Sequence, residues 1–102
     1  MELKPGSRLR STTESTEVVV VKAPSSDVDL RCGGHPMAAL TAEGGATQPV
    51  ADGFGDGTQV GKRYADDEVG LEVLCTKAGP GTLSLGLDPL PVKGAKPLPS
   101  SD

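Results

Sequence analysis

Few side chains in this sequence offer chemistry beyond packing and solvation. The segment Cys32-Gly33-Gly34-His35 brings a thiol and the only imidazole of the chain close together in sequence. A thiol and an imidazole can both bind zinc, and a thiolate beside a base is also a nucleophile. Structural zinc needs four ligands, and the first half of the chain offers Cys32, His35 and Glu14. No Asn or Asp is evidently placed to orient His35, so a nucleophilic pair is not favoured.

An acidic, glycine-rich stretch, Asp52-Gly53-Phe54-Gly55-Asp56-Gly57, is the second place to look for a ligand site. An EF-hand loop would need an oxygen ligand in place of Phe54 and a glutamate where Arg63 stands. The phosphate-binding pattern Gly-x-Gly-x-x-Gly also fails, because Thr58 occupies its last position. We therefore predict a flexible loop here.

Residues 13–37 resemble the metal-proximal hairpin of desulforedoxin-like and rubredoxin-like proteins. The likeness rests on a valine-rich strand followed by Leu30-Arg31-Cys32-Gly33-Gly34-His35-Pro36-Met37. In that family, a cysteine-rich knuckle binds iron or zinc through four thiolates, so the resemblance implies a small metal-binding protein. The family opens its hairpin with Cys-x-x-Cys, where this chain has Thr13-Glu14-Ser15-Thr16-Glu17. Only Cys32 matches a ligand position, so we predict no metal and no other cofactor; Cys32 and His35 are the best candidates if a site exists.

The segments expected to position these residues occur as two similar copies in the sequence. A shift of 55 positions places residues 16–23 on 71–78 without a gap, and it places Gly6 and Arg8 on Gly61 and Arg63. The same register continues to Leu30 opposite Leu85, and a two-residue deletion then brings His35 opposite Asp88. Such self-similarity predicts an internal duplication. Each cysteine falls opposite an aliphatic residue of the other copy, which is typical of a thiol that packs in a core.

Each copy is predicted to form a lead-in strand, about 6–12 and 61–66, followed by a hairpin, about 16–32 and 70–87. A β-branched run from Val18 to Val21 and the turn residues after it support the hairpin. Strict alternation indicates half-buried strands in both copies; its members are Val28, Leu30 and Cys32 in the first and Leu83, Leu85 and Leu87 in the second.

The predicted fold is all-β, with two tandem pseudo-repeats, each a strand plus a β-hairpin, packed about a pseudo-two-fold axis as a small sandwich or barrel. The first β repeat spans 1–40, a Gly/Ala-rich linker or loop spans 41–55, the second repeat spans 56–95, and a Pro-rich tail spans 96–102. The two repeats share one core and form a single domain.

The composition limits the function. The chain has no Trp, one Phe and one Tyr among 102 residues, so its core is thin and a monomer is expected to be marginally stable. The net charge of −4 comes without a basic stripe interleaved with aromatics, so no nucleic-acid partner is predicted. No apolar run is long enough for a membrane span, and we predict no membrane partner and a cytoplasmic location. The absence of Asn and Ile suggests a GC-rich bacterial gene.

We find no acid, base and nucleophile that converge, and therefore predict no enzyme and no catalytic residue. The leading hypothesis is a small non-catalytic accessory or interaction subunit, which binds a protein partner or self-associates into a homo-oligomer through exposed β edges. The alternative is a rubredoxin-like small protein that binds zinc or iron.

Overall fold

The computed structural model describes residues 3–40 and 49–92, which form strands and no helix. The first half contributes five strands and the second half four. They are β1 (Arg8–Arg10), β2 (Glu17–Lys22), β3 (Leu30–Cys32), β4 (His35–Pro36), β5 (Ala38–Ala39), β6 (Arg63–Asp66), β7 (Leu71–Lys77), β8 (Leu83–Leu85) and β9 (Asp88–Pro89). The predicted all-β class is confirmed.

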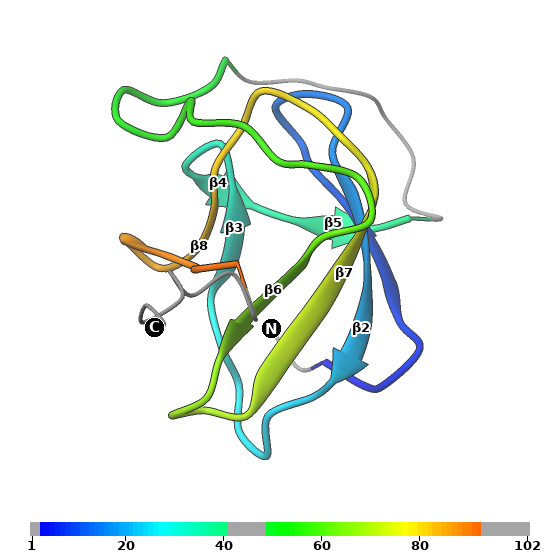
Figure 1. The fold of residues 1–102 in the computed structure, drawn as a ribbon. Coiled ribbons are helices and arrows are strands. Elements are labelled where there is room, and N and C mark those ends of the chain that lie inside the picture. The colour runs from blue at the N-terminus through cyan, green and yellow to red at the C-terminus, as the bar shows by residue number, and fades with distance from the viewer. Residues whose placement is uncertain (1–2, 41–48, 93–102) are drawn as a thin grey trace, which may run out of the picture.

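The strands form two antiparallel sheets that face each other (Figure 1). The five-stranded sheet has the order β5-β1-β2-β7-β6, and the four-stranded sheet has the order β4-β3-β8-β9. Alternate residues of β2, namely Val18 and Val20, are 1% exposed and point into the space between the sheets. The core between the sheets is almost entirely aliphatic, with Tyr64 as its one buried aromatic side chain in the described part.

Strand pairing joins the two halves at the middle of each sheet, through β2–β7 and β3–β8. Hydrogen bonds of one half recur at the matched positions of the other. The N–H of Gly6 donates to the Val20 carbonyl at 2.8 Å, and the N–H of Gly61 donates to the Cys75 carbonyl at 2.9 Å. This is the pattern that a two-fold relation between the halves would give. The duplication itself stays a prediction, because strand pairing describes the present molecule and not its origin.

The predicted hairpins over residues 16–32 and 70–87 do not form. β2 pairs with β1 and β7, whereas β3 pairs with β4 and β8, so the two strands of each expected hairpin lie in different sheets. The segment between the two strands crosses from one sheet to the other and does not form a hairpin turn. Alternating apolar residues identify a strand and its buried face, but they do not name its neighbour.

The strand after each crossing also differs in detail from the prediction. Leu30 and Leu83 are fully buried, but Leu85 is only partly buried and Leu87 is 75% exposed. The N–H of Met37 donates to the Leu30 carbonyl, and that of Leu90 donates to the Leu83 carbonyl, so Leu83 and not Leu85 is the counterpart of Leu30. The change of register between the halves thus lies before Leu30, in the crossing segment, and not after it.

The loop before β6 packs on the sheets where it is described, from residue 49 onward. The N–H of Ala51 donates to the Gly33 carbonyl at 2.8 Å, and the N–H of Thr82 donates to the Phe54 carbonyl at 2.8 Å. These bonds tie the loop to the β3–β4 turn and to the start of β8. The other part of the expected linker, residues 41–48, and the predicted Pro-rich tail, residues 96–102, lie outside the described residues.

Candidate functional site

Both cysteines are free thiols with their side chains in the core. Cys32 in β3 is 0% exposed and Cys75 in β7 is 1% exposed. Burial, together with the negative charge of Glu14, raises the pKa of Cys32 to about 12. Burial also raises the pKa of Cys75. Both thiols are therefore protonated at neutral pH, and a protonated thiol is a poor nucleophile.

His35 lies opposite Cys32 in the β3–β4 pair, across a two-residue turn made by Gly33 and Gly34. The φ angles of these glycines are +68° and +87°, the left-handed region that this kind of hairpin turn requires. A Cβ at Gly33 would also collide with the side chain of Thr13. The turn geometry thus explains why glycine stands at both positions, without a metal site. In residues 3–40 and 49–92, no three His, Cys, Asp or Glu side chains gather closely enough to hold a metal ion.

The Glu14 carboxylate is the centre of a partly buried polar network beside Cys32. Its Oε2 accepts hydrogen bonds from the Thr16 hydroxyl at 2.6 Å and from the Gly81 N–H at 2.8 Å. Its Oε1 accepts from the Thr16 N–H at 3.1 Å and lies 3.6 Å from the Cys32 Sγ, whose thiol can donate to it. The Thr16 hydroxyl also lies 3.0 Å from that of Thr58.

This network joins the turn before β2 to the loop before β8. Gly79 and Gly81 leave room for it, because a Cβ at Gly79 would collide with the Glu14 carboxylate and one at Gly81 would lie 3.2 Å from the Cys32 sulfur. Burial alone would raise the pKa of Glu14, but the hydrogen bonds from Thr16, Gly81 and Ser11 outweigh it and lower that pKa. The carboxylate is therefore ionised at neutral pH, and its charge holds the two loops together.

Sequence reasoning treated Glu14 only as one more metal ligand and overlooked Thr16 and Thr58. A signal was present in the repeat, since its register places Thr16 on Leu71 and Thr58 on Leu3. All four side chains are buried. Two hydroxyls thus stand in one end of the core where the matching end has two leucines. A polar residue at a buried aliphatic position predicts a hydrogen-bond network around it.

The outer face of the five-stranded sheet is the second candidate. One row of paired residues crosses it, with Arg8 opposite Val19, Val19 opposite Leu74, and Leu74 opposite Arg63. The apolar pair is only partly buried, and both arginines are exposed. The neighbouring rows add Arg10, Glu17, Lys77, Ala65, Glu72 and Lys22. We call these ten residues the basic face.

The basic face carries five cationic and two anionic side chains, although the whole chain has a net charge of −4. Both carboxylates are paired. Glu72 lies 3.4 Å from Arg63, and Glu17 lies 3.9 Å from Lys77. The positive excess at this face is therefore local, and the rest of the molecule is correspondingly acidic.

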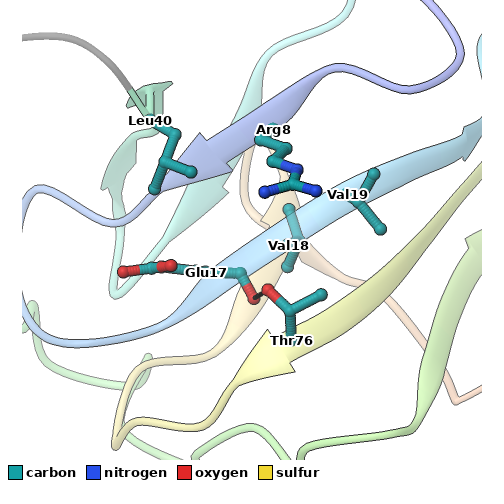
Figure 2. A pocket seen from close by; sticks show the side chains of 6 residues that line it. All are labelled: Arg8, Glu17, Val18, Val19, Leu40 and Thr76. Atoms are coloured by element: carbon teal, nitrogen blue, oxygen red, sulfur yellow. Dashed lines mark hydrogen bonds between the residues drawn. The ribbon is translucent and has the colours of Figure 1, made fainter.

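A cavity of about 280 Å³ opens on the basic face, over β1 and β2 (Figure 2). Among the described residues it is lined by Arg8, Glu17, Val18, Val19, Leu40 and Thr76. Figure 2 shows the Arg8 guanidinium near Val19, its cross-strand partner, and the Glu17 carboxylate extending away from Arg8. Cationic, apolar and anionic groups thus line one small space.

The acidic loop offers no comparable arrangement. Asp52 and Asp56 are exposed, and the N–H of Asp56 donates to the Thr82 hydroxyl at 2.9 Å. Within the described ranges there is also no helix of a length and apolarity that would cross a membrane. Comparison with protein-family models, with curated protein sequences and with solved structures found no significant match to this chain.

Proposed function

We propose that this protein is a small non-catalytic interaction subunit that binds an acidic protein partner through its basic face. The observation that supports the proposal is the row from Arg8 to Arg63, in which two arginines flank the partly exposed pair Val19 and Leu74. An apolar centre with cationic side chains around it is complementary to an acidic surface that has apolar side chains at its own centre. Arginine is also enriched at protein interfaces.

The strand edges are less suited to this role than the sequence suggested. Pro36 in β4 and Pro89 in β9 lie on the outer edges of the four-stranded sheet, and proline cannot donate a hydrogen bond to an added strand. The edge of β6 is bridged to Val92 through Tyr64. Of the edges in the described part, β5 is left, and it is two residues long. Short and proline-containing edges resist pairing with another chain.

Self-association through the same face is disfavoured by its charge. Two copies that met face to face would bring two sets of five cations together, with only two carboxylates on each side. Like charges across an interface suppress that pairing. A different partner with an acidic surface is therefore the better match. A cytoplasmic location fits the two unpaired thiols, because thiols stay reduced in the cytosol.

The test is a quantitative binding experiment with two double variants of equal charge change. Arg8→Gln with Lys22→Gln removes two charges of the basic face, and Lys4→Gln with Lys62→Gln removes two exposed charges in the turns before β1 and β6. Proteins cross-linked to each form in the source cells are counted by mass spectrometry. We expect recovery of an acidic partner to fall at least about tenfold for the first variant only, which corresponds to about 1.4 kcal/mol.

Equal losses in both double variants would show a general charge effect and contradict the proposal. So would a purified dimer in analytical ultracentrifugation that dissociates when the basic face is neutralised, because the occupant would then be a second copy.

Metal binding is the second candidate, because Cys32 and His35 lie opposite each other across the Gly33–Gly34 turn and both residue types bind zinc. A zinc or iron site would need further ligands, since within the described ranges no three His, Cys, Asp or Glu side chains gather closely enough to hold a metal ion. Elemental analysis of untagged protein separates the candidates, since a competent site would retain near-stoichiometric zinc or iron and a purely structural network would retain neither.

A further inference from the structure

The two halves hold the same charged residues at matched positions but pair them differently. Arg63 and Glu72 form an ion pair at 3.4 Å across β6 and β7. Their counterparts in the first half are Arg8 and Glu17. Glu17 instead lies 3.9 Å from Lys77, and Arg8 makes no side-chain hydrogen bond or ion pair with any described residue. The cavity of the basic face lies where the first half lacks this ion pair.

We propose that this cavity binds a small organic acid with a short aliphatic chain, in a site that does not depend on the protein partner. The carboxylate pairs with the guanidinium of Arg8, whose planar set of N–H donors matches two carboxylate oxygens. The aliphatic chain lies against Val19 and Leu40, which form the apolar wall. The space of about 280 Å³ equals that of roughly nine waters at about 30 Å³ each, which accommodates an acid of four to six carbons.

The remaining charge in the cavity does not prevent this binding. Glu17 also lines the space, but Lys77 lies 3.9 Å from its carboxylate and offsets its charge. The hydroxyl of Thr76 is already engaged, because it donates to the Glu17 carbonyl at 3.2 Å. Arg8 is therefore the group in the cavity that lacks a partner among the described residues, and it selects an anion.

Sodium butyrate is the first probe, with n-butanol and n-butylammonium as probes of the same chain length that lack the negative charge. Each is titrated into the full-length protein at constant ionic strength, and amide and methyl shifts are followed by NMR. We expect butyrate to bind in the millimolar range and to shift Val19 and Leu40, and the other two to bind at least tenfold more weakly. Hexanoate is expected to bind more tightly than acetate, because more of its chain contacts the apolar wall.

Arg8→Gln and Arg63→Gln form the matched pair of variants. Both arginines are exposed on the same face, but only Arg8 lines the cavity. Arg8→Gln is expected to weaken butyrate binding at least tenfold, and Arg63→Gln to leave it within twofold of the unmodified protein.

Equal binding of butyrate and butanol would overturn the proposal, as would equal effects of the two substitutions, which would indicate general attraction to the basic face. If no acidic protein partner is recovered but butyrate still binds as expected, only the proposed function is contradicted. Failures of the two proposals are therefore distinguishable.

Discussion

Replacing Glu14 with glutamine should destabilise the protein by about 2 kcal/mol, because the buried network around it loses an acceptor. The substitution keeps the shape of the side chain but turns one of its two acceptor oxygens into an N–H donor. If Oε2 is lost, the Gly81 N–H has no acceptor, and if Oε1 is lost, the Thr16 N–H has none. A buried donor left without a partner costs about 1–3 kcal/mol, and hydrogen bonds to a charged group contribute about 1.5–3 kcal/mol. Because Glu14 is partly exposed, water can replace part of the lost hydrogen bonding, which places the expected loss of stability near the middle of the range.

The assay is urea unfolding of both proteins at neutral pH, supported by thermal melts. For a domain of this size, about 2 kcal/mol corresponds to a fall in Tm of roughly 8–16 °C. Glu68→Gln is the control, because it removes the same charge from an exposed residue, where substitutions change stability by less than about 0.5 kcal/mol. If Glu14→Gln proved as stable as Glu68→Gln, the carboxylate would not hold the two loops together and the network would lose its structural role.

Three further outcomes follow from the same network. Folding lowers the pKa of Glu14, so its contribution to the free energy of unfolding is complete above its ordinary pKa of 4.5 and is lost as the pH falls through the lower folded value. Below pH 4.5, the free energy of unfolding measured in urea should therefore fall more steeply with pH for the parent protein than for Glu14→Gln. Cys32, with its pKa raised to about 12, should resist iodoacetamide at pH 8 until the protein unfolds, and mass spectrometry that found rapid labelling of the native protein would contradict its assigned burial. Gly79→Ala should destabilise the protein by more than about 1 kcal/mol in urea, because the new Cβ collides with the Glu14 carboxylate, whereas Gly55→Ala, whose Cβ would make an ordinary 3.7 Å contact, should be close to neutral.

The positions of the main strands could be predicted from the sequence because they depend on local pattern. The run from Val18 to Val21 lies in β2, and the alternation of Leu83 and Leu85 lies in β8. Strand pairing could not be predicted in the same way. β2 lies next to β7, which belongs to the other half of the chain, and its burial pattern is the same whichever strand is its neighbour. The expected hairpins failed because turn residues mark a change of direction and do not say whether the chain returns to the same sheet.

The polar network was hidden for a related reason. Residues 11–16 are all Ser, Thr or Glu, which usually indicates an exposed turn. Ser11 and Thr16 are nevertheless buried, at 2% and 0% exposed. Thr16 lies against Gly79 of the other half, where an added Cβ would come within 2.6 Å of the Thr16 hydroxyl oxygen, and the composition of residues 11–16 does not predict such a contact.

The two halves differ in the polar side chains that they bury at the ends of the core. Positions that only build the sheets are similar in both halves, as Val18 and Val73 are in the core. At one end of the core, however, Thr16 and Thr58 stand where the other end has leucines. A buried hydroxyl needs a hydrogen-bond partner, whereas a buried leucine side chain needs none. The two threonines therefore offer no packing advantage over leucine at these positions.

The same comparison applies on the surface of the five-stranded sheet. In the second half, the exposed Arg63 and the buried Glu72 form an ion pair. In the first half, the matching residues Arg8 and Glu17 line a cavity. Both halves have an arginine and a glutamate at these positions, but Glu17 lies 3.9 Å from the Lys77 ammonium and is not paired with Arg8. In Lys77→Met, Glu17 is free to pair with Arg8 and its charge is no longer offset, so butyrate should bind more weakly on both grounds. Unaltered butyrate binding in Lys77→Met would show that the cavity stays open for another reason.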